Sequence, residues 1–159
     1  MERPDTLIAA ILEEDRLLRE RLDLCPDQLR EVKGSGGTLS LKDTLGHLAF
    51  WDSFAVQFFN RKLDGVDAGQ TRRVNFEQRN REELQRIREL PFDEVFALYR
   101  TATRNLISFL RNRWHELSVQ QRRDIRLPLK HRRHHRLLLD SALPYYARED
   151  ESREAEGEA

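Results

Sequence analysis

Residues 40–60 read SLKDTLGHLAFWDSFAVQFFN, and this stretch decides the fold class. Its large apolar side chains recur at steps of three, four and seven residues, which is the spacing of one face of an α-helix. Ser40, followed three residues later by Asp43, resembles a capping box at a helix start, with Asp in place of the usual Glu. The stretch therefore predicts an amphipathic helix from about Ser40 to Asn60. Its apolar stripe consists of Leu41, Leu45, Leu48, Trp51, Ala55, Phe58 and Phe59.

Three further segments show the same periodicity. The first is expected to run from about Asp5 to Asp23, and a third long helix from Pro91 to about Trp114. The fourth starts near Pro128, after a connector, and Pro144 is expected to end or kink it. Residues 75–90 predict a short polar helix, and the glycine-containing stretches 33–38 and 61–73 predict loops. The sequence thus predicts an all-α four-helix bundle with a short extra helix between its second and third helices.

Composition narrows the class of protein. The 159 residues suffice for one domain, expected over residues 1–147, and the 28 acids balance the 28 bases. The single cysteine, Cys25, excludes a disulfide framework and a multi-cysteine zinc site. No apolar run approaches the roughly 20 residues that cross a bilayer, and the first residues lack the features of a signal peptide. We expect a cytoplasmic protein. The tail, residues 148–159, has six acids, two bases and no large apolar side chain, which predicts disorder.

Three histidines form a candidate metal site. His131 and His135 are four residues apart, so their side chains lie one above the other on one helix face. His47 lies in the aromatic face of the helix over residues 40–60. Facing helices of a bundle hold metals with such inward side chains. Two other interpretations stay open on spacing alone: KHRRHHRL is a solvated basic face, or His47 is a core histidine bonded to a carbonyl. His115 and His134 are expected to be structural or surface residues.

These motifs resemble a known family. SLKDTLGHLAFWD is similar to the second-helix signature of the DinB-like superfamily of metal-binding four-helix bundles, and HRRHH is similar to its fourth-helix His-x-x-x-His. The resemblance covers about residues 5–147. It implies that His47, His131 and His135 bind a divalent ion, typically zinc or nickel. Two departures concern the pocket: Leu39 stands where the family usually has tryptophan, and Arg132 stands where it often has tyrosine.

The resemblance implies hydrolysis of a small electrophile, or transfer of a low-molecular-weight thiol to it. The alternative is a non-catalytic metal- or ligand-binding stress-response protein, because no general base stands at a convincing spacing. A third hypothesis is nucleic-acid binding by residues 100–136, which hold eleven bases against two acids. Few aromatic residues are interleaved there, so nucleic acid is not the favoured partner. A small-molecule substrate is expected, no membrane partner is expected, and a homodimer is kept as an alternative to a monomer.

Overall fold

The computed structural model describes the backbone of residues 3–33, 39–66 and 75–157, and side chains as far as residue 142. The part of the chain it describes is helical and contains no strand, which confirms the all-α prediction. Most residues of the predicted loops 33–38 and 61–73 lie outside the described residues, at 34–38 and 67–73, and the prediction is wrong for residues 61–63, which are helical. No described helix is both long enough and apolar enough to cross a membrane. The elements are α1 (Asp5–Leu24), η1 (Asp27–Leu29), α2 (Leu41–Leu63), α3 (Phe76–Glu89), α4 (Phe92–Arg113), η3 (Trp114–Glu116), α5 (Val119–Asp124) and α6 (Leu127–Gly157).

The start of α2 follows the sequence signal in one respect and departs from it in another. The Ser40 hydroxyl accepts a hydrogen bond from the backbone N–H of Asp43 at 3.0 Å, as an N-cap does. The Asp43 carboxylate does not complete a capping box; its contact is with Arg88 of α3, at 3.4 Å. A complete capping box is found instead at α5, between Ser118 and Gln121.

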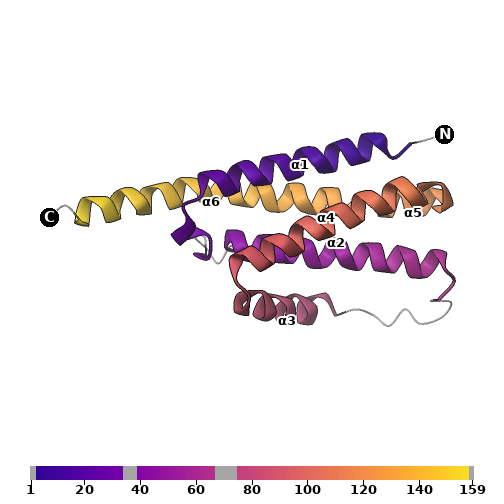
Figure 1. The fold of residues 1–159 in the computed structure, drawn as a ribbon, viewed down its shortest axis with the longest axis horizontal. Helices are drawn as coiled ribbons and strands as arrows, with labels where there is room; N and C mark the ends of the chain where they lie inside the picture. Colours follow the sequence, from indigo (N-terminus) through magenta and orange to yellow (C-terminus); the bar gives the residue numbers. More distant parts are fainter. Residues whose placement is uncertain (1–2, 34–38, 67–74, 158–159) are drawn as a thin grey trace.

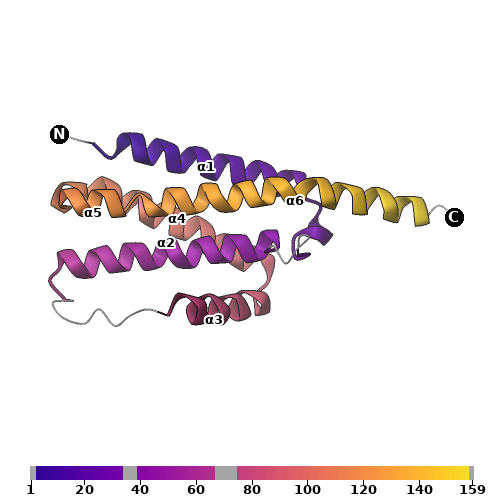
Figure 2. The same ribbon diagram turned by 180° about the vertical axis from the view of Figure 1, so that it is seen from behind.

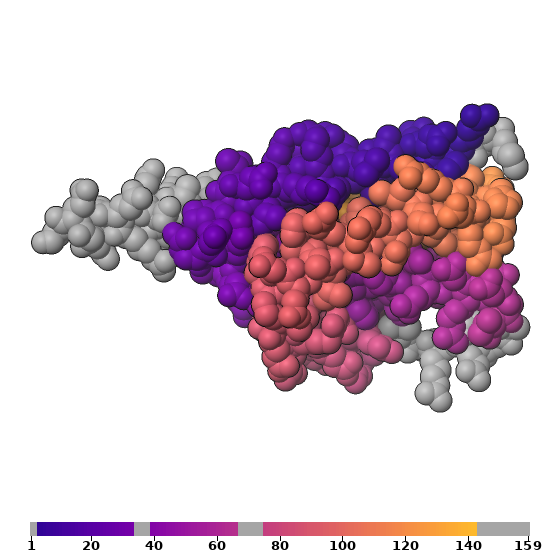
Figure 3. Space-filling model, viewed as in Figure 1, coloured from indigo at the N-terminus to yellow at the C-terminus, as the bar shows by residue number. Residues whose placement is uncertain are grey.

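Four long helices, α1, α2, α4 and α6, run along a common direction (Figure 1). Viewed from behind, α6 lies between α1 and α2, with α4 on the far side (Figure 2). The space-filling view of Figure 3 shows the opposite face, where α1 and α4 cover α6. α3 packs on α2 at Gly46, where a Cβ atom would come within 2.5 Å of the Ile87 side chain. Only glycine permits this close approach. Gly46 immediately precedes His47, so α3 packs on α2 next to the candidate histidine.

The interior contains two apolar clusters at different levels of the long helices. One includes Leu18, Leu45, Tyr99 and Leu139, and the other includes Ile11, Phe59, Leu106 and Ile125. Each of the four long helices or their immediate extensions contributes to both clusters. The predicted stripes of α1 and α4 are buried throughout, at Leu7, Ile8, Ile11, Leu18, Leu22, Val95, Tyr99, Ala102, Leu106 and Leu110.

The structure differs from the predicted connector and from one of the two outcomes predicted at Pro144, a helix end or a kink. The expected connector between the third and fourth long helices contains a helix of its own, α5. α6 does not end at Pro144 but continues to Gly157, beyond the ends of the other helices in Figure 1. Proline removes one backbone hydrogen-bond donor, and neighbouring turns can continue across the missing bond at a cost in stability. Residues 148–157 of the acidic tail belong to α6 as a helical extension.

Deleting residues 149–159 should leave the thermal unfolding midpoint nearly unchanged. The segment carries five of its acids within eight residues and no large apolar side chain, so it has little to bury. The measurement is a melting curve of the truncated chain beside that of the full chain. A fall of more than a few degrees would show that the tail docks on the folded helices.

Candidate metal centre

His47, His131 and His135 meet at one point of the structure, and we call them the histidine cluster. The Nε2 atom of His131 lies 2.9 Å from Nε2 of His47 and 3.1 Å from Nε2 of His135. One ligand atom from each residue can be chosen so that all three lie within 4.8 Å of one another. The three rings are arranged edge to face, with centroids 4.7–4.8 Å apart. The structure thus brings together the three residues that the sequence singled out.

The spacing of these nitrogens fits a shared cation better than a set of hydrogen bonds. A ring nitrogen is either a donor or an acceptor, and it has one in-plane direction for either role. His131 Nε2 therefore cannot complete good hydrogen bonds to both neighbours. Zinc binds imidazole nitrogens at about 2.0–2.1 Å, which in a tetrahedral site separates the nitrogens by about 3.3 Å. The observed 2.9 and 3.1 Å are close to this spacing, so the donor set fits a zinc-sized ion.

The cluster is assembled by two helices that lie side by side in Figure 2. α2 supplies His47, and α6 supplies both His131 and His135 from consecutive turns of one face. All three side chains are half-buried. Each of the three side chains thus keeps part of its surface in contact with solvent, and an exchangeable ligand requires such access.

The electrostatics keep the cluster neutral near pH 7. Burial is the largest cause, and it lowers the pKa of all three imidazoles. For His131 and His135, the charge that His47 would carry acts next, and the pKa values fall to about 4 and about 3. A neutral imidazole offers its lone pair, and this is the form that binds a metal.

The same shifts predict a pH dependence of stability. The folded pKa values of His131 and His135 lie below the unfolded value of about 6.5. The unfolded chain therefore binds more protons between about pH 3 and pH 6.5, and the stability of the metal-free protein rises with pH across this window. The urea midpoint, measured with a chelator present, should fall as pH is lowered from 7 to 4. His135→Ala should show a smaller fall than wild type, and equal slopes would refute this explanation.

Beside the cluster lies a set of buried polar side chains that sequence reasoning missed. Arg132, fully buried, donates to Asp52 at 2.5 Å, to Thr103 at 2.7 Å and to the Tyr99 hydroxyl at 2.8 Å. The Tyr99 hydroxyl in turn donates to Asp15 at 2.8 Å. The members come from all four long helices, and we call them the buried polar layer: Asp15 of α1, Asp52 of α2, Tyr99 and Thr103 of α4, and Arg132 of α6.

A signal for this layer was present in the sequence. Asp52 falls on the apolar stripe of α2, four residues after Leu48, and Asp15 falls on that of α1, four residues after Ile11. Arg132 stands seven residues from both Ile125 and Leu139, which are buried. A charged residue at a core position requires a buried partner. The three charged residues at core positions of three helices are therefore expected to be partners of one another.

The remaining bases of HRRHHR are used to hold α6 against α1. Arg133 and Arg136 both bind the buried Glu14 of α1, at 3.0 and 2.6 Å. Asp140 of α6 binds Arg21 of α1 at 2.6 Å. The interpretation of this run as a solvated basic face is therefore wrong for Arg132 and Arg136, while Arg133 remains largely exposed.

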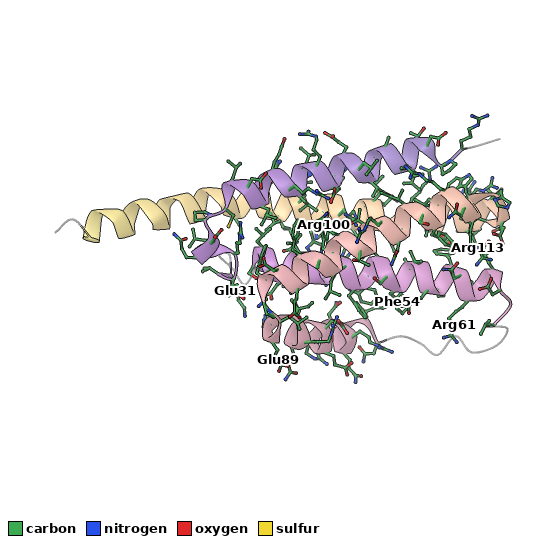
Figure 4. The ribbon with its side chains drawn as sticks, viewed as in Figure 1. Glu31, Phe54, Arg61, Glu89, Arg100 and Arg113 are labelled. Carbon is green, nitrogen blue, oxygen red and sulfur yellow. The ribbon has the colours of Figure 1, made fainter. Side chains whose placement is uncertain are left out.

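Bases elsewhere in residues 100–136 differ in their surroundings. Arg113, near the end of α4 in Figure 4, binds Asn60 and Asp64 of the α2 end and Glu116 of η3. Arg122 lies over the Trp114 ring and donates to its backbone carbonyl. Arg100, also labelled in Figure 4, is exposed on α4. Arg113 and Arg122 of this basic region thus connect separate elements of the chain through ion pairs, hydrogen bonds and a ring contact.

The other histidines and the cysteine are placed away from the cluster's nitrogens. His115 is exposed on η3, and His134 is exposed on α6, with its ring centroid 5.2 Å from that of His135. Cys25 is buried, and burial raises its thiol pKa. A buried thiol held in its neutral form is a poor nucleophile.

A half-buried aromatic strip continues from the cluster along α2. The His47 and Trp51 rings have centroids 6.5 Å apart, and Trp51 and Phe54 have centroids 5.3 Å apart. Phe58 follows at 6.4 Å from Phe54. The Trp51 indole N–H donates to Asn80 of α3 at 2.8 Å, which fixes the ring at the α2–α3 junction. The cluster therefore has an apolar aromatic neighbourhood on the α2 side.

Comparisons with known proteins add no relative. No protein-family model matches the chain, and neither the curated proteins nor the solved structures compared with it contain a match.

Proposed function

We propose that the chain is a metal-dependent enzyme of DinB-like, four-helix-bundle type. It acts on a small electrophile, as a hydrolase or as a low-molecular-weight thiol S-transferase. The observation that carries the proposal is the convergence of three neutral imidazoles from two helices, His131 Nε2 being within 3.1 Å of both partners. Zinc and nickel are the ions we expect, since imidazole suits both.

The donor set defines what the site can do. A bound divalent ion supplies a Lewis acid and lowers the pKa of a water or thiol bound to it. His47, His131 and His135 would hold it with three uncharged ligands, so its positive charge is not cancelled by the protein. A three-histidine set leaves a fourth position for an exchangeable ligand, as in catalytic zinc sites. Trp51 lies beside His47, and Phe54 lies beside Trp51, so the α2 side of the cluster presents an apolar surface.

The two reactions differ in the nucleophile. In hydrolysis, water adds to the electrophilic carbon and the leaving group departs with a proton. In S-transfer, the thiol sulfur bonds to that carbon, the leaving group departs and the thiol proton goes to solvent. The histidine cluster serves either reaction by positioning the nucleophile. The aromatic strip on α2 favours an electrophile with an apolar body.

A second candidate function rests on a specific observation. Among the described residues, the cluster of possible metal ligands contains three histidines and no carboxylate. A site without an adjacent carboxylate lacks the most common companion for proton transfer. This favours the non-catalytic alternative, a metal- or ligand-binding stress-response protein.

Cobalt-loaded protein tests the proposal. Adding a small thiol such as cysteine should produce a thiolate-to-cobalt charge-transfer band, and the loaded protein should speed consumption of monochlorobimane by that thiol. His47→Ala should show neither effect. Consumption of an electrophile without thiol would indicate the hydrolase, and no band and no turnover with either nucleophile would favour the non-catalytic protein.

A further inference from the structure

The two helices that form the histidine cluster belong to different closely packed pairs, α2 with α4 and α6 with α1. α2 packs most extensively on α4, and α6 packs most extensively on α1, while the direct packing of α2 on α6 is sparser. The α2–α6 packing is nevertheless the main direct contact between the two pairs, so the placement of His47 relative to His131 and His135 depends on it. A further contact between α2 and α6 would fix that placement more firmly.

The buried polar layer provides that contact. Arg132 immediately follows His131 on α6, and Asp52 lies five residues after His47 on α2. Their ion pair joins α2 and α6, with both side chains fully buried. The same guanidinium donates to Tyr99 and Thr103 of α4. The position of α6 is therefore fixed against both α2 and α4.

The layer also occupies a distinctive level in the molecule. Three members stand between residues of the two apolar clusters: Asp15 between Ile11 and Leu18, Asp52 between Leu48 and Phe59, and Thr103 between Ala102 and Leu106. Tyr99 belongs to the first cluster and borders this level. Apolar packing alone tolerates sliding of one helix along another, whereas a guanidinium that donates to three partners keeps all three hydrogen bonds in one alignment only. A single buried polar residue sets helix register in coiled coils, and the same principle applies to this layer.

We propose that Arg132, held by Asp52, Tyr99 and Thr103, is a positioning residue that sets the register of α6 against α2 and so keeps the histidine cluster convergent before any metal binds. This inference rests on the proposed metal site for its affinity readout but makes a separate claim about the metal-free chain. Arg132 touches neither metal nor substrate in this role; it acts through His131.

The sharpest test replaces the ion pair with apolar residues. In Asp52→Leu/Arg132→Met, the Tyr99 hydroxyl still donates to Asp15, and the Thr103 hydroxyl still donates to the Tyr99 carbonyl. No described partner of the pair is left with an unpaired donor. Such replacements are often neutral or stabilising, so the variant should fold. The control is Leu110→Ala. It creates a cavity in the apolar cluster that includes Ile11 and Phe59, which lowers stability without changing the buried polar layer.

Zinc affinity of the folded proteins, measured by competition with a chromophoric chelator, is the first readout. We expect the double variant to bind zinc about 10- to 100-fold more weakly than wild type, the loss typical when groups that orient metal ligands are removed. Leu110→Ala should keep wild-type affinity despite its lower melting temperature. An unchanged affinity in the double variant would overturn the proposal and leave the layer a purely structural role.

Crystal structures of the metal-free proteins are the second readout. Wild type should keep the His47 and His131 Nε2 atoms in contact, and the double variant should lose that contact. If wild type binds no zinc, the proposed function fails, but this comparison still decides the inference: convergence retained in the double variant refutes it, and convergence lost supports it.

Discussion

Replacing His47 with alanine should abolish stoichiometric metal binding. The variant leaves only the two imidazoles of α6, and two histidines on one helix contact an ion from one side only. We expect a larger loss of zinc affinity than the about 10- to 100-fold that follows removal of a group that merely orients a ligand. In wild type, free zinc at about 1,000 times its Kd should raise the free energy of unfolding by about 4 kcal/mol, and this increase should vanish in His47→Ala.

His115→Ala is the matched control for that experiment. His115 is exposed on η3, outside the cluster, so its removal should leave both metal content and zinc-dependent stabilisation at wild-type values. Metal content by elemental analysis and unfolding in urea with and without zinc give the two readouts. A folded His47→Ala protein that keeps its metal at full occupancy would show that the three-histidine site is wrong.

The largest effect on stability is expected from Arg132→Met. This change leaves Asp52 fully buried without its cation, and breaking a buried pair in this way typically costs 3–5 kcal/mol, so we expect the free energy of unfolding to fall by about 4 kcal/mol. Adding Asp52→Leu should recover most of the loss, because the orphaned charge is then removed as well. Urea unfolding of the three proteins measures both steps.

Arg133→Met, one residue along the same helix, provides the comparison. The Arg133 side chain is 55% exposed, and its partner Glu14 also binds Arg136. Exposed pairs contribute at most about 1 kcal/mol, so this variant should be nearly as stable as wild type. Equal losses in the free energy of unfolding for Arg132→Met and Arg133→Met would show that the buried polar layer contributes no more to stability than an exposed ion pair.

Apolar periodicity predicted the helices well because burial of a stripe imposes the spacing directly. The buried stripes of α1 and α4 follow from that rule, whereas the start of α2 follows from the N-cap signal at Ser40. The histidine cluster was predictable for the same reason: His47 stands in an apolar stripe, and His131 and His135 have the i,i+4 spacing. That His47 of α2 meets the two histidines of α6 could be established only from the structure.

The parts that escaped prediction depend on partners far apart in sequence. Arg132 stands in a run of seven basic and histidine residues, 130–136, so the sequence does not distinguish it as the arginine of that run that is fully buried. Its partners Asp52 and Tyr99 are 80 and 33 residues away. The path of α6 through Pro144 escaped for a different reason, since proline disfavours a helix interior without excluding it.

The central claim is that one divalent ion is held by three imidazoles, and the most direct test is a crystal structure of the purified protein with anomalous diffraction recorded at the zinc and nickel absorption edges. We expect one anomalous peak per chain, about 2.0–2.2 Å from Nε2 of His47, His131 and His135, with a fourth ligand that is not a protein side chain. A fully occupied peak elsewhere, or crystals grown with micromolar zinc and nickel that show no peak at the cluster, would contradict the account.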